Sequence, residues 1–145
     1  SMFSVHGDWR ILVIDNYVLQ WFSGTWNEEA ANQYSQEFKE RTAMLNGSQW
    51  AIFSLFDDWE LGVPEIASHL IAHCQAFKDN GCVKDCHIYA PSVWKNMLLE
   101  NIVPQSEGQY ERRVFSSPDD AIRWMKSCGF SIQLAHFLQS LPQND

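Results

Sequence analysis

The chain has 145 residues, of which 46% are hydrophobic and 19% charged, a composition typical of one globular domain with its own core rather than of a disordered segment. Its 18 acidic and 10 basic side chains give a formal net charge of −8 at pH 7, which opposes binding to nucleic-acid phosphates and to anionic membrane surfaces. No apolar run approaches the roughly 20 residues that a membrane-spanning helix needs.

The first residues predict a hairpin followed by a third strand. Residues 3–6 and 9–15 have strand-like composition, and Gly7-Asp8 between them is typical of a two-residue hairpin loop. Asp15-Asn16 predicts the next turn, and the aromatic segment 17–22 predicts another strand. The chain is therefore expected to begin with a small β unit.

A helix and a buried strand come next. Thr25 and Glu28 match a capping box at the start of a helix, for which Asn27 is an alternative cap. Asn46-Gly47 ends this helix, and the continuous apolar segment 50–56 is typical of a strand that is covered on both faces. The alternation of strand, helix and strand predicts an α/β domain.

The four residues after this strand are the main candidates for a functional site. Asp57, Asp58, Trp59 and Glu60 precede Pro64, which suits the first turn of a second helix, so we expect them to form an acidic turn. Folds of the α/β class place functional groups at the carboxyl ends of their parallel strands. A simpler interpretation is that the acids only cap the helix and complement its dipole.

The rest of the chain continues the alternation. Segments of helix and strand type follow in turn, at residues 64–79, 83–90, 91–101, 110–115 and 118–128. The last of these helices has a clear start, with Ser117 as its cap and Pro118 in the first position. Charged side chains on the last of the strands suit an edge of the sheet, where they discourage pairing with another chain. We expect one domain over 3–128, and over 129–145 an amphipathic segment and tail that packs on the domain or on a dimer partner.

The order of elements and three local features resemble the STAS-like superfamily, and in particular its small, uncharacterised bacterial SpoIIAA-like proteins. The features are the aromatic strand that runs into Gly24-Thr25-Trp26-Asn27, the Asn46-Gly47 break before Trp50, and the closing segment 113–124. The resemblance implies a mixed, mostly parallel sheet of five or six strands, an N-terminal hairpin and helices mainly on one side.

The resemblance also implies a function. Regulatory members of the superfamily carry Asp-Ser-Ser/Thr-Gly after a central strand, with a serine that is phosphorylated at the start of a helix. Asp57 falls at that aspartate, but no serine or threonine occurs between Ser54 and Ser68. The sequence therefore predicts a non-enzymatic regulatory or binding module that lacks the phosphorylatable serine. It would act through protein interaction at the acidic turn 57–60, where fixed carboxylates replace the roughly −1.5 to −2 charge of a phosphate.

Two other functions stay open. Trp26 and Trp59 both lie between a strand and a helix, where they would line the mouth of an apolar pocket or form a binding hot spot. Together with the analogy to lipid-carrying CRAL-TRIO-type domains, this indicates a carrier or sensor of a small hydrophobic ligand. The third function is an enzyme that uses Asp57 and Asp58 as paired carboxylates.

We expect no cofactor, no metal and no catalytic residue. The chain has no Gly-x-Ser-x-Gly elbow, no Gly-rich phosphate loop and no Cys-x-x-Cys pair, and its four cysteines are expected to be buried free thiols. Glu65, His69 and His73 share one helical stripe, which predicts a solvated helix face rather than a metal site. The N-terminus lacks the basic region and apolar core of a signal peptide, which favours the cytoplasm.

Overall fold

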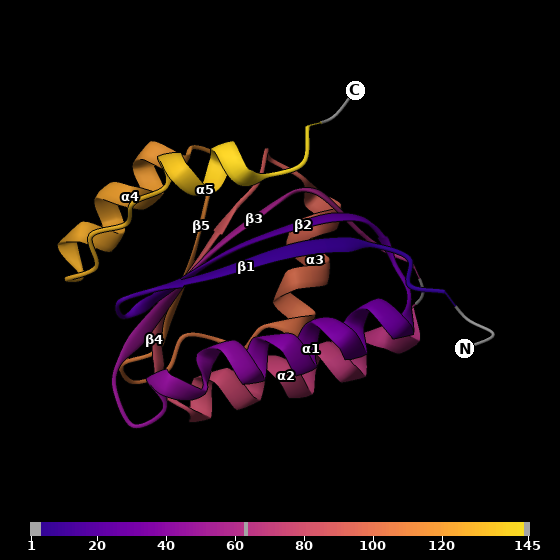
Figure 1. Cartoon of the computed structure of the whole chain (residues 1–145), viewed down its shortest axis with the longest axis horizontal. Helices are drawn as coiled ribbons and strands as arrows, with labels where there is room; N and C mark the ends of the chain where they lie inside the picture. Colours follow the sequence, from indigo (N-terminus) through magenta and orange to yellow (C-terminus); the bar gives the residue numbers. More distant parts are fainter. Residues whose placement is uncertain (1–3, 63, 144–145) are drawn as a thin grey trace.

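A mixed β-sheet forms the centre of the molecule (Figure 1). In the computed structural model, which describes residues 4–62 and 64–143, the sheet has five strands in the order of the sequence. The strands are β1 (Asp8–Ile14), β2 (Tyr17–Trp26), β3 (Trp50–Leu61), β4 (Cys82–Ile88) and β5 (Glu111–Phe115). β1 is antiparallel to β2, and all later neighbours are parallel. The predicted α/β class and mixed sheet are thus confirmed.

Helices cover both faces of this sheet, with the larger helical layer on one side (Figure 1). α1 (Glu28–Thr42), α2 (Ala67–Asp79) and α3 (Val93–Ile102) cover one face, because parallel strands in sequential order need crossovers of the same hand. The connections also contain the 3₁₀ turns η1 (Ala43–Leu45) and η2 (Pro64–Ile66).

The C-terminal part of the chain covers the opposite face. α4 (Pro118–Ser127) begins at the predicted Ser117 cap, whose hydroxyl accepts from the amide of Asp120, and α5 (Ala135–Ser140) follows it. Four apolar side chains of this part are buried against β2, β3 and β4 of the same chain, namely Phe130, Ile132, Leu134 and Phe137. The backbone N–H of Gln133 also donates to the hydroxyl of Tyr17 on β2 at 3.0 Å.

The predicted hairpin lies one strand later than expected. Residues 4–6 form no strand; they run beside the start of α1, where the backbone N–H of Asn27 donates to the carbonyl of His6 at 3.2 Å. The antiparallel hairpin joins β1 to β2 through Asp15-Asn16, with Asp15 at a φ of 49°. Gly7 allows close approach instead: a Cβ there would lie 2.4 Å from the indole of Trp26. Phe3 lies outside the described residues.

The start of α1 also differs from the predicted capping box. Thr25 belongs to the end of β2, and its hydroxyl donates to a carboxylate oxygen of Glu60 at 3.2 Å. The cap is Asn27, whose side-chain oxygen accepts from the amide of Ala30 at 3.0 Å. The alternative cap is therefore the correct one, because pairing with β3 carries β2 beyond Gly24.

The prediction that the charged strand lies at an edge is confirmed. β5 is the last strand of the sheet, and Glu111 on it forms ion pairs with Lys84 at 3.3 Å and with Arg113 at 3.1 Å. Within the described residues, no helix has the length and hydrophobicity needed to cross a membrane.

Candidate functional site

The predicted acidic turn is not a turn but the second half of β3. Asp58, Trp59 and Glu60 pair in parallel with residues 23–25 of β2, after a register shift opposite Phe22. The shift places one more residue on β3 than on β2, which is a β-bulge, and a bulge re-aims the side chains that follow it. The prediction of a turn fails because the pairing with β2 extends the strand past its apolar segment.

The bulge sends the acidic and the aromatic side chains of this segment in different directions. Asp57, Asp58 and Glu60 are exposed, whereas Trp59 is 3% exposed and Trp26 is 1% exposed. The two indoles therefore lie in the interior beneath α1, α2 and α3, and the carboxylates lie on the surface at the end of the sheet. The five predicted residues do not form a single site.

Of the three acids, Asp57 makes contacts with the residues after β4 and with α3. Oδ1 of Asp57 accepts from the backbone N–H of Ala90 at 2.7 Å. The ammonium of Lys95 on α3 donates to the carbonyls of Phe56 and Asp57 at 2.7 and 2.5 Å. The N-cap residue of α2 is Ile66, and no side chain caps the helix there. These acids therefore do not cap α2, contrary to the simpler interpretation.

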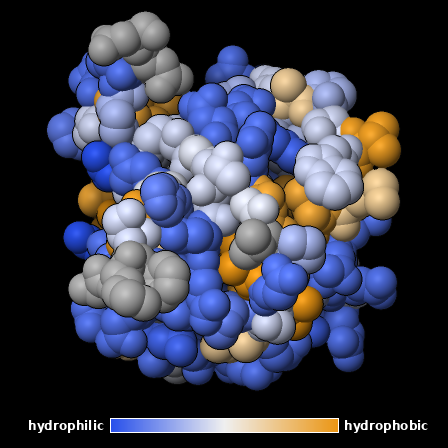
Figure 2. Space-filling view, turned by 90° about the vertical axis from the view of Figure 1, so that its right-hand side faces the viewer, coloured by the Kyte–Doolittle hydropathy of each residue, from blue (hydrophilic) through white to orange (hydrophobic). Residues whose placement is uncertain are grey.

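Beside these acids, the first turns of α3 expose large hydrophobic side chains. Val93 is 78% exposed, Trp94 63% and Met97 58%. Figure 2 looks at the end of the sheet where β2 and β3 finish, and hydrophobic side chains gather there near the centre and at the right-hand side of the view, with hydrophilic surface around them. The contacts of Lys95 with the backbone of Phe56 and Asp57 place the start of α3 beside the end of β3.

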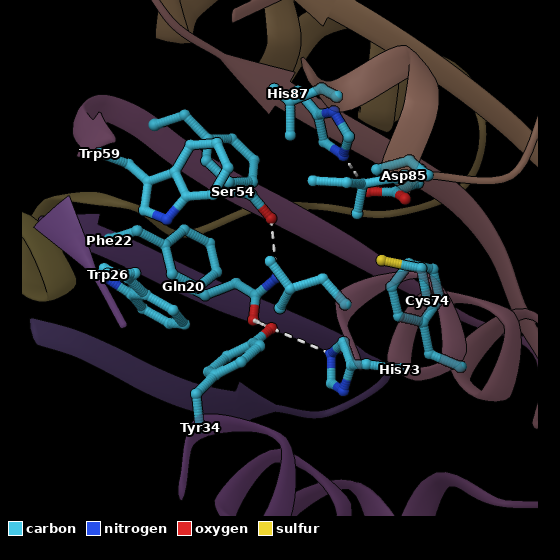
Figure 3. Close-up of a pocket in the computed structure, with 16 residues that line it drawn as sticks. Gln20, Phe22, Trp26, Tyr34, Ser54, Trp59, His73, Cys74, Asp85 and His87 are labelled. Carbon is cyan, nitrogen blue, oxygen red and sulfur yellow. Dashed lines mark hydrogen bonds and ion pairs between the residues drawn. The ribbon is translucent and has the colours of Figure 1, made fainter. Parts of the chain in front are cut away.

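A cavity lies between the sheet and the layer of α1, α2 and α3 (Figure 3). Its volume is about 40 Å³, which exceeds the roughly 10–15 Å³ that one water molecule needs. Aromatic side chains form much of its lining, namely Phe22, Trp26, Tyr34, Phe56, Trp59 and Phe77. The predicted candidates Trp26 and Trp59 thus lie in the wall of an interior cavity rather than at a surface mouth.

Buried polar side chains cross this cavity from the sheet to the helices. Gln20 on β2 donates to the hydroxyl of Ser54 on β3 at 2.8 Å and accepts from the hydroxyl of Tyr34 on α1 at 2.7 Å. A ring nitrogen of His73 on α2 lies 3.2 Å from the same hydroxyl, and the other lies 3.1 Å from Ser35 Oγ. β2 and β3 thus each contribute one polar residue that is hydrogen-bonded inside the protein, as buried polar groups require.

Burial controls the ionisation of the groups contributed by the helices. Burial, and then the positive charge of Lys39, lower the pKa of His73 to about 4. Burial also raises the pKa of Tyr34 well above its usual value. At neutral pH both groups are therefore uncharged, and they serve as hydrogen-bonding partners. His73 is only 4% exposed, so the predicted solvated stripe is correct for His69 and wrong for His73.

A second buried network lies on β4 and β5. Asp85 and His87 on β4 are 1% and 2% exposed, and both line the cavity. The hydroxyl of Tyr110 donates to Oδ2 of Asp85 at 2.7 Å, and Nε of Arg112 donates to Nδ1 of His87 at 3.0 Å. Burial raises the pKa of Tyr110, and the Asp85 carboxylate acts in the same direction. Arg112, expected to protect the edge, instead reaches inward.

Three of the four cysteines are buried as free thiols. Burial raises the pKa of Cys74, Cys82 and Cys86, and the charge of Asp85 adds to this effect, so these thiols stay protonated. No group of three or more histidine, cysteine, aspartate or glutamate side chains in the described part of the chain is placed to hold a metal ion.

Comparison with solved structures identifies the fold. The chain superposes with a TM-score of 0.61 on the crystal structure of an uncharacterised protein from the DUF3478 family with a SpoIIAA-like fold from Shewanella loihica PV-4. The match covers 86% of this chain and 98% of that chain, at 14% sequence identity. The chain has a SpoIIAA-like fold. No protein-family model and no curated protein matches the sequence significantly.

The segment that joins β3 to α2 carries no hydroxyl side chain. No serine or threonine occurs between Ser54 and Ser68, and Ser54 is 1% exposed and accepts from Gln20. Ser68 lies on α2, where its hydroxyl donates to the carbonyl of Glu65. The exposed end of β3 thus presents carboxylates and no hydroxyl.

Sequence reasoning did not single out Gln20, Ser54, Asp85 and His87 as site residues. A signal was present, because each is a polar residue within a strand whose neighbours are largely apolar. The strands alternate between two buried faces, so such a residue must point into the interior. What the sequence did not indicate is that His87 lies opposite Ser54 and Asp85 opposite Ile52, since this depends on the register between β3 and β4.

Proposed function

We propose that the protein is a non-enzymatic regulatory module that binds a partner protein at the end of β3 and the start of α3. This β3–α3 surface consists of Asp57, Asp58, Glu60, Val93, Trp94 and Met97. It keeps the acidic segment as the point of interaction and adds to it the apolar side chains of the neighbouring helix.

The observation that carries this proposal is the exposure of Val93, Trp94 and Met97, which are 58–78% exposed on consecutive turns of one helix. Exposed apolar side chains rimmed by polar ones are typical of protein-interaction sites. Tryptophan is also the residue type most enriched among those that dominate binding energy. An isolated exposed side chain would need no explanation, but three adjacent ones do.

The charges of the surface indicate the kind of partner. Asp58 and Glu60 are exposed, and the ammonium of Lys95 is directed to backbone carbonyls rather than to these carboxylates. With a net charge of −8 over the whole chain, the field favours a basic partner and speeds its encounter. We infer a partner segment with apolar side chains flanked by lysine or arginine, bound without any prior modification of this chain.

Photo-crosslinking in the cells of origin tests this proposal. A crosslinking amino acid at position 94 should give a discrete adduct, and Asp58→Asn combined with Glu60→Gln should weaken it. Position 44 is a matched control, because Met44 is 75% exposed in a different part of the molecule. Equal adducts at positions 94 and 44, or an adduct at 94 that does not depend on the carboxylates, would refute the proposal.

The cavity supports a second function, the binding of a small ligand. Its aromatic lining favours an apolar molecule, as the alternative prediction of a carrier or sensor requires. A volume of about 40 Å³ suits a molecule of few atoms and not a lipid chain. Binding of small apolar compounds, followed by the NMR signal of the Trp59 indole, tests this function independently of any partner protein.

A further inference from the structure

One carboxylate oxygen in the cavity makes no hydrogen bond, although His87 lies close to it. Asp85 is 1% exposed, and its Oδ2 accepts from Tyr110, but Oδ1 makes no hydrogen bond. Within the described residues, the other buried side-chain atom in this condition is Nη2 of Arg112. A buried acceptor without a donor is costly, because it has lost its bonds to water and gained none. A bound group that donates to Oδ1 would recover this cost.

The neighbouring side chains hold Asp85 in place without satisfying Oδ1. Nε2 of His87 lies 3.0 Å from Oδ1, but the pair does not have hydrogen-bond geometry. The guanidinium of Arg112 donates to Nδ1 of His87 instead of to the carboxylate. The network thus fixes the position of the carboxylate and leaves Oδ1 free for a ligand.

The other side chains that line the cavity indicate what kind of molecule it would accept. In Figure 3, Phe22, Trp26 and Trp59 lie toward one end of the group and Asp85 toward the other. Between them, the side chain of Gln20 already makes its bonds within the protein. A ligand therefore meets aromatic surface along its body and one unsatisfied acceptor at its end.

We propose that the cavity binds a small apolar molecule with a single hydrogen-bond donor, an alcohol or an amine, which donates to Oδ1 of Asp85. The inference rests on the ligand-binding function that the cavity supports and is independent of the β3–α3 surface. The volume of about 40 Å³ equals about three water-sized units at roughly 10–15 Å³ each. Ligands with a few non-hydrogen atoms therefore fit without any opening of the core.

Three probes of equal size test the proposal. 2-Propanol and isopropylamine carry a donor, whereas acetone has the same shape and is only an acceptor. The whole protein is titrated with each probe, and binding is followed by the NMR signals of the Trp59 indole. We expect at least one donor probe to bind at least about tenfold more tightly than acetone, because a site built to bond a donor rejects an analogue without one. Which donor binds better decides whether the bound group is neutral or charged.

The variant Asp85→Asn should reverse this preference. The Tyr110 hydroxyl keeps the amide oxygen on its own side, so the amide N–H₂ replaces Oδ1 and favours acetone. Asp119→Asn, the same change at an exposed carboxylate on α4, is the matched control and should leave the preference unchanged. If Asp85→Asn does not fold, the comparison of the three probes in the unmodified protein still decides. Equal binding of all three refutes the donor site and leaves ligand binding intact; no binding of any probe refutes both.

Discussion

The buried imidazole of His73 should make the stability of the protein depend on pH between about 4 and 6.5. His73 is 4% exposed, and burial followed by the charge of Lys39 lowers its pKa from 6.5 to about 4. The negative charge of Asp85 acts in the opposite direction but is the smaller effect. The ring also packs against Phe38 and Phe77, with centroids 4.7 and 5.8 Å away, so water cannot solvate the protonated form.

The sign of the effect follows from proton linkage. Between pH 4 and 6.5 the unfolded chain binds a proton at His73 and the folded chain does not, so stability rises with pH in this window. The contribution is complete above pH 6.5 and is lost as the pH falls to about 4. A difference of this size between the two pKa values corresponds to about 3 kcal/mol, at about 1.4 kcal/mol per pH unit.

Urea unfolding at a series of pH values measures this effect. His73→Gln removes the titrating group, so the difference in unfolding free energy between wild type and variant should shrink by about 3 kcal/mol from pH 7 to pH 4. His69→Gln, which removes an exposed imidazole one turn earlier on α2, should keep the wild-type pH dependence. A constant difference between wild type and His73→Gln over the whole range would show that the ring is accessible to protons in the folded state.

Three further predictions concern packing, backbone strain and thiol access. Trp59→Ala should lower the unfolding free energy by about 3–5 kcal/mol, because it enlarges the cavity. Trp94→Ala, at the exposed α3 site, should change the unfolding free energy by less than about 0.5 kcal/mol. Unfolding of both variants in denaturant measures the two values. Gly7→Ala should lower the unfolding free energy by about 2 kcal/mol or more, because φ is +115° and the new Cβ would lie 2.4 Å from a buried indole. Gly47→Ala, at φ +88° with no atom within 4 Å, should lower it by about 1 kcal/mol. An equal loss of stability in the two variants, seen in thermal melts, would contradict the close contact at Gly7. In the native protein a thiol reagent should modify Cys128 first, because the other three cysteines are buried and the pKa of each of their thiols is raised. Rapid reaction of all four cysteines, seen by mass spectrometry, would contradict this burial.

Local patterns in the sequence determined the class of the fold and many of its elements. The continuous apolar segment that begins at Trp50 indicated a strand covered on both faces, and the structure has helices on both sides of it. Ser117 and the proline after it marked the start of α4 correctly, because a cap acts within one turn of the chain. The charged residues of β5 indicated an edge strand, because charges within a strand discourage pairing with another chain.

Only the tertiary structure decided the length of β3 and the composition of the cavity. Pairing with β2 carries β3 through Asp57 to Leu61, although these residues have the composition of a turn. The same pairing creates the bulge that turns Trp59 inward. The meeting of Asp85 with Tyr110, and of Gln20 with Tyr34 and Ser54, depends on the register of strands and on helix packing between residues far apart in sequence. A local pattern can indicate that a side chain is buried, but its partners are set by long-range pairing, and these partners decide which group is left free to bind a ligand.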